Sequence, residues 1–359
     1  MRILQIIDSL EAGGAERMAV NYANALVDKI DFSGLVVTRK EGALRNQLSK
    51  KVTYLFLNKK RAIDSRALFR LRHYVVQNQV THIHAHSTSF FMAFLLKITY
   101  PKIQLIWHDH YGNSEFLESR PVIGLKIILP FFRGIIAVNQ KLKRWSEEKK
   151  LSKKILYLPN FPSKESDVSE YTFLKGTMGK RIVSLANLRI QKNHFLLVEV
   201  AKMIKKSYPD WTFHLVGKDF EDDYSQEIKN LISEFELENT IFIYGSKQDI
   251  KNILEQSTIA ILTSQSEGLP VALLEYGWHG KPVVVTNVGE IPMLIQDGIS
   301  GFVVETNAVS SFYEVLIKLI ESDTLQINFG ETLRQDITNN YSEETIVNEY
   351  INWVQNSCK

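Results

Sequence analysis

Short apolar runs alternate with amphipathic segments along most of the chain, and this pattern predicts buried strands connected by helices. Strands separated by helices form parallel βαβ units, and a succession of such units makes a doubly wound α/β sheet. In the first half the strands are predicted at 3–7, 34–38, 53–56, 82–85, 104–107, 134–138 and 155–158, and the helices at 15–27, 65–77, 89–97 and 140–149.

Residues 160–180 interrupt this alternation with proline, serines, acidic residues and two glycines, a composition typical of a linker. An amphipathic segment at 342–353 ends the pattern, and Ser342 followed by two glutamates is a helix N-terminus signal. We therefore expect two Rossmann-like domains that face each other across a ligand-binding cleft. In the second half the strands are predicted at 181–186, 212–216, 240–244, 259–263 and 282–286, and the helices at 193–207, 224–236 and 269–277.

Composition narrows the class of protein. A chain of 359 residues with 45% hydrophobic and 23% charged residues is long enough for two cores and excludes wholesale disorder. The single cysteine, Cys358, can form no internal disulfide and no cysteine metal site, which fits a reducing compartment. Residues 1–8 are too short and polar for a signal peptide, and Lys126 and Arg133 interrupt the most apolar stretch. We expect a cytoplasmic protein without a membrane span.

Charge is divided unevenly along the chain. Residues 1–164 carry a net charge of +15 and residues 165–359 one of −12. A basic half suits nucleic acid, anionic lipid headgroups or a phosphorylated substrate, although surface lysines alone also explain it. Basic residues cluster at 50–72 and 141–154, the latter after an apolar run at 121–136. No nucleic-acid recognition motif accompanies the charge, so we expect no nucleic-acid partner.

A glycine loop follows the first predicted strand. Gly13 and Gly14 stand where the strand gives way to a helix, so the backbone there can approach a ligand closely and the helix N-terminus can attract phosphate. The loop is not GxGxxG, and no acidic residue ends the second strand. A nicotinamide cofactor is therefore not expected, and no other cofactor is implied. A plain turn is the alternative interpretation.

The sharpest motif is SEGLPVALLE at 266–275. Glu267 falls in the loop after a predicted strand, Gly268 allows close approach, and Pro270 is placed to begin a helix. Glu275 lies about two helical turns further on, so both carboxylates can reach one cleft, where they suit the hydroxyls of a sugar and a ribose. The alternative is an acidic residue that favours the helix dipole, together with one surface glutamate.

Taken together, the motifs resemble the retaining glycosyltransferases of family 4, which have the GT-B fold. The resemblance covers nearly the whole chain. It implies an acceptor-binding domain at 1–165, a nucleotide-sugar-binding domain at 180–340 and a C-terminal helix at 341–359 that crosses back to the first domain. The motifs that carry it are the GGAER loop, LANLRIQKNH at 185–194, the two glutamates of SEGLPVALLE, TNVGEIP at 286–292 and GISGF at 298–302.

The resemblance also implies roles for single residues in the nucleotide-sugar-binding domain. Glu267 would bind donor-sugar hydroxyls and Glu275 the ribose, and Lys192 would neutralise the departing diphosphate, a role that its charge alone also favours. The backbone amides of Gly268 and Leu269 would meet the sugar or the diphosphate.

Three further donor-binding candidates come from the glycine loop and from a departure from the family pattern. Gly13 and Gly14 are expected to contribute to donor binding. The family often has an arginine where this chain has Asn187, and Arg189, two residues later, can supply the missing charge.

The family places a histidine after a strand of the first domain. IWHDHYG at 106–112 offers His108 and His110, and we favour His108 because it directly follows the apolar run. The resemblance implies retention at the anomeric carbon without an assigned covalent nucleophile. The chain has no Asp-x-Asp sequence, in agreement with GT-B enzymes that need no metal for catalysis.

We therefore expect a transferase that moves a sugar from a nucleotide-sugar donor, a UDP-sugar rather than a GDP-sugar, to a saccharide or lipid-linked acceptor in surface polysaccharide biosynthesis. Peripheral contact with an anionic membrane at its inner face is part of this expectation. One alternative is a metal-dependent hydrolase that uses His82, His84 and His86 with His108 and His110, since alternate residues of a strand share a face. The other is a non-catalytic GT-B partner subunit.

Overall fold

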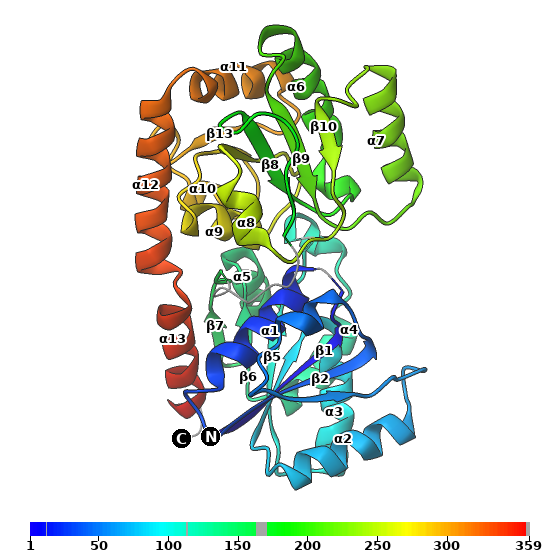
Figure 1. Cartoon of the computed structure of the whole chain (residues 1–359). Coiled ribbons are helices and arrows are strands. Elements are labelled where there is room, and N and C mark those ends of the chain that lie inside the picture. Colours follow the sequence, from blue (N-terminus) through cyan, green and yellow to red (C-terminus); the bar gives the residue numbers. More distant parts are fainter. Residues whose placement is uncertain (12, 113, 163–170, 357–359) are drawn as a thin grey trace. The chain divides into compact units, whose positions relative to one another are not determined.

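The computed structural model describes residues 1–11, 13–112, 114–162 and 171–356. The chain divides into two compact units, one formed by Met1–Lys164 with Glu343–Lys359 and the other by Glu165–Ser342. Elements are labelled in Figure 1, and each unit is described by itself. Residues 163–170 of the expected linker, Ala12 of the glycine loop and Cys358 lie outside the described residues.

The first unit is built on a parallel sheet of seven strands in the order β3-β2-β1-β4-β5-β6-β7. The order reverses between β1 and β4, so the loops that follow these two strands leave the sheet in opposite directions and border a crevice at its carboxyl edge. The strands are β1 (Arg2–Ser9), β2 (Phe32–Lys40), β3 (Thr53–Phe56), β4 (His82–His86), β5 (Gln104–Asp109), β6 (Gly134–Ala137) and β7 (Ile155–Tyr157).

Helices cover both faces of this sheet. Alternate residues of a strand point to opposite faces, and α2 to α5 share a core with Leu4 and Ile6, whereas α1 shares one with Ile7. The side chain of Asp64 accepts a hydrogen bond from the Ala67 amide at 3.1 Å and so begins α2. The helices are α1 (Gly14–Leu26), α2 (Ser65–Gln77), α3 (Phe90–Thr99), α4 (Ile123–Ile128), α5 (Gln140–Glu148) and α13 (Glu343–Asn356), with short 3₁₀ turns η1 (Ala43–Gln47), η2 (Ser87–Ser89), η3 (Ser114–Ser119) and η4 (Leu129–Phe131).

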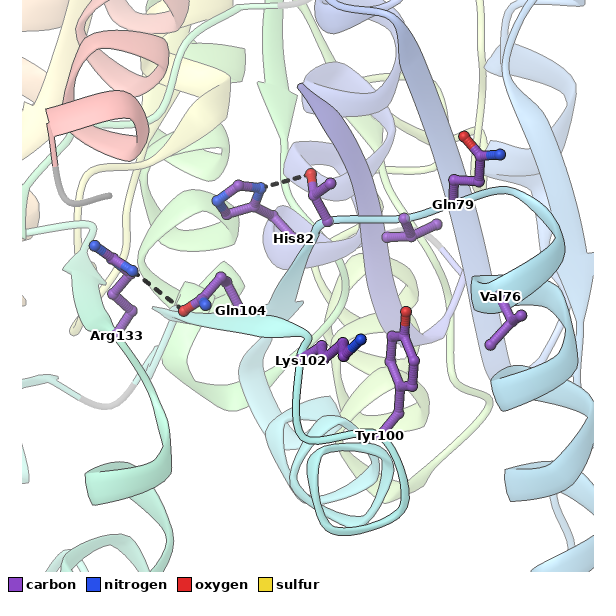
Figure 2. A pocket seen from close by; sticks show the side chains of 9 residues that line it. Val76, Gln79, His82, Tyr100, Lys102, Gln104 and Arg133 are labelled. Atoms are coloured by element: carbon purple, nitrogen blue, oxygen red, sulfur yellow. Dashed lines mark hydrogen bonds between the residues drawn. The ribbon is translucent and has the colours of Figure 1, made fainter. Parts of the chain in front are cut away.

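The opposite, amino edge of the same sheet carries a pocket of about 490 Å³. Figure 2 shows it where β4, β5 and β6 begin, with His82, Gln104 and Arg133 among its lining side chains. This pocket and the carboxyl-edge loops are therefore at opposite ends of the strands.

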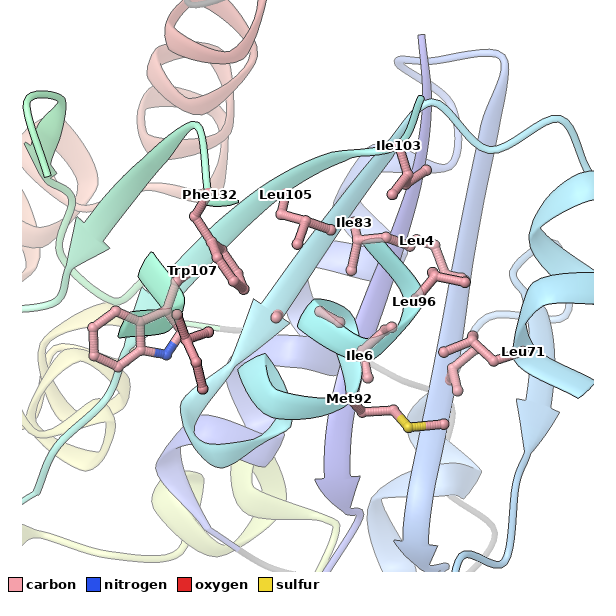
Figure 3. Packing of buried hydrophobic residues seen from close by; sticks show 14 of the residues in the cluster. Leu4, Ile6, Leu71, Ile83, Met92, Leu96, Ile103, Leu105, Trp107 and Phe132 are labelled. Carbon is pink, nitrogen blue, oxygen red and sulfur yellow. The ribbon is translucent and has the colours of Figure 1, made fainter. Parts of the chain in front are cut away.

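The main core of the first unit lies between the sheet and helices α2 to α5. Figure 3 shows Leu4, Ile6 and Ile83 from the strands meeting Leu71 of α2 and Met92 and Leu96 of α3. All of these side chains are buried. Burial of this much apolar surface, at about 25 cal/mol per Å², is what holds the helices on this face of the sheet.

The C-terminal helix α13 belongs to the first unit and lies beside α1, where Figure 1 shows the red end of the chain next to the blue end. Its buried Tyr350 has its ring centroid 5.0 Å from that of Tyr22 on α1 and 5.0 Å from that of His84 on β4. A Cβ placed on Gly134 would lie 2.8 Å from the Trp353 ring, so α13 also approaches the start of β6 closely.

The second unit has a parallel sheet of six strands in the order β10-β9-β8-β11-β12-β13, which reverses between β8 and β11. The strands are β8 (Arg181–Leu185), β9 (Thr212–Val216), β10 (Ile241–Ile243), β11 (Ile259–Leu262), β12 (Val283–Thr286) and β13 (Phe302–Val304). The helices are α6 (His194–Ser207), α7 (Asp223–Glu234), α8 (Ile250–Glu255), α9 (Val271–Trp278), α10 (Ile291–Leu294), α11 (Val309–Ile320) and α12 (Asp323–Asn340), with the 3₁₀ turn η5 (Ile190–Lys192).

The predicted doubly wound α/β class is confirmed in both units. The twelve predicted strands all form, two of them with the expected bounds, at Thr53–Phe56 and Thr212–Val216. The structure adds α4 inside the apolar stretch at 121–138, where no polar periodicity marks a helix, and it adds β13, α8, α10, α11 and α12.

Replacing Tyr350 with alanine should lower the free energy of unfolding of the first unit by about 3–5 kcal/mol, the range for truncating a buried aromatic side chain. The reason is that the ring fills the space between α13, α1 and β4. Urea unfolding measures the change. The exposed Asn352→Ala on the same helix serves as the control and should stay within about 0.5 kcal/mol of wild type. Equal stability of the two variants would show that α13 is not held by its buried face.

Candidate functional site

The second unit brings two loops together where β8 and β11 separate. The two strands pair Ile182 with Ile259 and Val183 with Ala260. Beyond this, the hydroxyl of Tyr276 on α9 accepts a hydrogen bond from the Leu185 amide at 2.6 Å and lies 3.4 Å from the Ile261 carbonyl, to which it donates. Tyr276 thus joins the ends of both strands beneath the loops that follow them.

Lys192 and Glu267 meet above this point. Lys192 Nζ lies 2.5 Å from Glu267 Oε1, and the hydroxyl of Ser264 donates to the same oxygen at 2.7 Å. Glu267 is only 7% exposed, whereas the side chain of Lys192 is 22% exposed. The loops are tied together by their backbones as well, since the Gln265 amide donates to the Gln191 carbonyl at 2.8 Å. A cation and an anion 75 positions apart in sequence are therefore one group in the fold.

A third loop, which follows β12, contacts the backbone of Glu267. Gly289 has a φ of +60°, and a Cβ there would lie 2.2 Å from the Glu267 carbonyl oxygen. Only glycine fits a position with both a left-handed backbone and so close an approach. The next residue, Glu290, donates its amide to the Gly268 carbonyl at 3.0 Å. The TNVGEIP motif therefore fixes the backbone of the SEGLP loop.

The other carboxylate of the motif, Glu275, is buried in α9 at 7% exposure. Burial raises the pKa of Tyr276, and the charges of Glu275 and Glu267 raise it further. Leu269, which lies between the two glutamates in the sequence, is also buried. Glu267 and the Gly268–Leu269 backbone thus precede the start of α9, and Glu275 lies within this helix.

The predicted substitute cation, Arg189, is exposed and lies over an aromatic ring. Its guanidinium is 4.4 Å from the centroid of Phe220, and Lys218 Nζ is 4.8 Å from the same centroid. The side chain of Asn187 accepts a hydrogen bond from the Lys218 amide at 2.8 Å. Lys218, which sequence reasoning missed, follows β9 at the carboxyl edge, and that position after a predicted strand was the signal that could have found it.

At the carboxyl edge of the first sheet, Gly13 and Gly14 begin α1 directly after the loop that follows β1. A Cβ on Gly14 would meet nothing within 4 Å, so packing inside the chain does not require glycine there. Asp8 of β1 accepts a hydrogen bond from Thr88, which follows β4, at 2.6 Å, and another from Thr38 of β2. The glycine loop therefore lies at the reversal point of this sheet.

Four histidines cluster beneath the same edge. His84 Nε2 lies 3.1 Å from His108 Nδ1, and His86 Nδ1 lies 3.0 Å from His110 Nε2. The other nitrogen of His86 is 2.9 Å from Gln5 Oε1, an oxygen that can only accept. His86 therefore carries its proton on Nε2, and His110 donates from Nε2 to His86 Nδ1.

Burial keeps these imidazoles neutral. Desolvation lowers the pKa of His84, His86 and His108 well below the ordinary value, and it lowers that of His110 to about 3. His108, the predicted donor-site histidine, has no exposed surface, whereas His110 is half-buried. The geometry therefore favours His110 over His108 as the histidine that a ligand can reach.

The positions of the histidines also bear on the alternative hypothesis of a metal-dependent hydrolase. Nitrogens of His84, His86 and His108 lie within 4.8 Å of one another, and neutral imidazoles are the form that binds zinc. Both nitrogens of His86 already have hydrogen-bond partners, and His82 instead contacts the Thr81 hydroxyl at 2.8 Å and lines the amino-edge pocket. The five histidines of the hydrolase hypothesis are thus not one site.

Helix length and hydropathy determine whether a helix can span a membrane. None of the helices in the described part of the chain is both long and apolar enough to cross a bilayer.

Two family models match the chain, Glycosyltransferase Family 4 over residues 12–162 and Glycosyl transferases group 1 over residues 171–336. The chain belongs to the glycosyltransferases of family 4. Together the two matches span the glycine loop, the histidine cluster and the Lys192–Glu267 pair of this glycosyltransferase. The predicted recognition is confirmed.

Relatives extend over the whole chain. An uncharacterized glycosyltransferase of Haemophilus influenzae is 25% identical, with 94% of this chain and 95% of the relative covered. The Escherichia coli UDP-Gal:alpha-D-GlcNAc-diphosphoundecaprenol alpha-1,3-galactosyltransferase is 24% identical, with coverage of 92% and 90%. The crystal structure of Anabaena HepE in complex with UDP and glucose has a TM-score of 0.78 at 18% identity and covers 99% of this chain and 100% of its own. The fold is GT-B.

The glycosyltransferase should lose stability as the pH falls from 7 to 5. A buried histidine that stays neutral in the fold has a pKa near 6.5 when unfolded, so below that pH the unfolded chain binds protons that the folded chain does not. Each such histidine lowers the free energy of unfolding by about 1.4 kcal/mol per pH unit, down to its folded pKa, about 3 for His110. Urea unfolding at pH 7, 6 and 5 measures the slope.

The variant His84→Gln should show a shallower slope than wild type by one histidine, because it removes one buried imidazole. The exposed His73→Gln is the matched control and should leave the slope unchanged. A wild-type stability that is constant between pH 7 and 5 would contradict the neutral cluster.

Proposed function

We propose that this glycosyltransferase moves a sugar, with retention at the anomeric carbon, from a nucleotide-sugar donor to a saccharide or lipid-linked acceptor in surface polysaccharide biosynthesis. The observation that carries the proposal is the Lys192–Glu267 pair at the reversal point of the second sheet. Open α/β sheets bind ligands at such a point. The Escherichia coli relative, named for UDP-galactose and a diphosphoundecaprenol acceptor, and the HepE complex with UDP support a uridine donor.

Transfer breaks the bond between the anomeric carbon and the diphosphate oxygen, and the leaving group takes the electron pair. The ammonium of Lys192 would stabilise the negative charge that develops there. Glu267 would accept hydrogen bonds from sugar hydroxyls, and Glu275 would do so from the ribose. Backbone amides of Gly268 and Leu269 complete the proposed donor site.

Groups of the first unit would assist. The helix N-terminus at Gly13 and Gly14 favours negative charge, and Gly14 has open space around its Cα. His110, rather than the fully buried His108, would contact the donor sugar. Turnover of His110→Gln should therefore fall further than turnover of His108→Gln in variants of equal thermal stability, and the reverse order would return the role to His108.

Loss of either member of the Lys192–Glu267 pair should abolish most of the activity. Removing one preorganised charge from a developing anion lowers turnover by about 100- to 1000-fold. We expect Lys192→Met and Glu267→Gln each to show a loss of that size in a radiolabelled transfer assay. Calorimetric titration should show that wild type binds UDP and not GDP, and that Lys192→Met binds UDP at least tenfold more weakly.

The control for this experiment is Lys206→Met, which removes an exposed lysine of α6 and should keep wild-type turnover. Wild-type turnover in both pair variants would remove the assigned site. Binding of neither nucleotide by wild type would contradict a nucleotide-sugar donor.

Peripheral contact with an anionic membrane is part of the proposal, and one face of the first unit supports it. Helices α2, α3 and α4 share the core on one side of the sheet, and their sequences contain no Asp or Glu. Exposed basic residues such as Arg66 and Lys126 stand on them. The same helices expose large apolar side chains, namely Phe69, Val76, Ile98, Ile123 at 79% and Ile127 at 63%. We call this the basic apolar face.

A double variant, Ile123→Ser with Ile127→Ser, should reduce binding to phosphatidylglycerol vesicles several-fold, because both side chains would enter the interface. Cosedimentation measures the bound fraction, which should also fall at high salt. The exposed Ile327→Ser on α12 of the second unit is the control. Vesicle binding that the double variant leaves unchanged would contradict the proposed contact.

A further inference from the structure

The pocket at the amino edge of the first sheet contains none of the residues that we assign to sugar transfer. It lies where β4, β5 and β6 begin, whereas the glycine loop and His110, which follows β5, lie at the carboxyl edge. Its volume of about 490 Å³ is that of a small-molecule site and exceeds what an inorganic anion alone would fill.

The lining of this pocket is polar and positively charged. Arg133 and Lys102 supply two cations, and His82, Gln104 and Tyr100 add groups that can hydrogen-bond. None of the described residues that line it is acidic. Figure 2 shows Arg133, Gln104 and His82 toward one end of the pocket, and Lys102 beside Tyr100 toward the other. An anionic ligand would therefore meet no repelling carboxylate in the lining.

Arg133 has hydrogen-bonding capacity that the protein does not use. Its Nη1 donates to Gln104 Oε1 at 3.3 Å, a long contact, and its Nε is buried with no acceptor among the described residues. A buried donor without an acceptor is costly, and the planar guanidinium matches two oxygens of a phosphate group.

Positive charges also act on the neighbouring side chain of His82. Burial lowers the pKa of His82 to about 4, with further lowering from the charges of Arg133 and the chain's amino group. The amino group itself is paired with Asp31. Within the described residues, neither Arg133 nor Lys102 of the lining forms an ion pair with a carboxylate.

We propose that this pocket binds a phosphate ester, with the guanidinium of Arg133 as its main contact and the ammonium of Lys102 as a second. A lipid headgroup and a free phosphate ester carry the same chemistry. Val76 is exposed on α2 and also lines the pocket, so the pocket opens beside the basic apolar face. The pocket shares no residue with the proposed donor site, and we expect its occupancy not to depend on the transfer reaction.

The test uses the full-length protein and glycerol 3-phosphate as the soluble probe, titrated calorimetrically at constant ionic strength. Arg133→Gln should weaken binding at least tenfold and Lys102→Gln about threefold to tenfold. The matched loss of charge in the second unit, Lys206→Gln, should have no effect. Binding of UDP should be the same in all variants, which separates this site from the proposed donor site.

A second arm distinguishes the source of the phosphate. Phosphatidylcholine vesicles carry either phosphatidylglycerol or an equal charge of oleate, which has no phosphate. If the ligand is a lipid headgroup, wild type prefers phosphatidylglycerol and Arg133→Gln loses the preference. If it is a free ester, glycerol 3-phosphate binds and the two vesicles bind equally.

Absence of both glycerol 3-phosphate binding and phosphatidylglycerol preference in wild type would overturn the proposal. So would binding that neither variant weakens relative to Lys206→Gln. Lys102 is exposed, so Lys102→Gln decides the matter if the half-buried Arg133 proves necessary for folding.

Discussion

The separation of β8 and β11 at the carboxyl edge of the second sheet is the constraint on which the proposed donor site depends. Because the strand order reverses there, the chain leaves the two neighbouring strands toward opposite sides, and the paired residues Val183 and Ala260 are followed by a gap between the strand ends. Tyr276 fills it from α9 with one hydroxyl that contacts both strand ends. The loops that carry Lys192 and Glu267 can therefore face each other while both stay anchored to rigid strands.

The ion pair between Lys192 and Glu267 explains how both side chains stay charged at the carboxyl edge of the sheet. A largely buried carboxylate needs a partner, and Lys192 and Ser264 supply it without any bound anion. In the proposed donor site, a diphosphate would compete with Glu267 for the ammonium of Lys192. The close approach of Gly289 holds the backbone of Glu267 in place, and this fixes the point from which its carboxylate extends.

Much of this could be predicted from sequence because it follows from local pattern. Apolar runs marked the strands, and SEGLP and TNVGEIP marked the loops, since glycine and proline constrain the backbone wherever they stand. What could not be predicted depends on contacts between distant segments. Alternation placed His84 and His86 on one face, yet only the fold shows Tyr350, more than 260 positions later, closing over them. Arg189 was predicted from the positive charge of its loop, but its guanidinium lies over the ring of Phe220.

The histidine cluster depends both on local sequence pattern and on contacts between distant segments. Gln5 has no ionisable proton, so the hydrogen bond from His86 Nε2 to its oxygen fixes the direction of the bond between His86 and His110. His86 must then accept from His110, and the remaining nitrogen of His110, Nδ1, is left as an acceptor at the carboxyl end of β5. Burial holds all four imidazoles neutral, which prevents protonation from reversing this order. A half-buried histidine of fixed tautomer accepts a hydroxyl hydrogen and cannot offer one, so the buried polar core of the first unit determines which hydrogen-bonding group its loop presents.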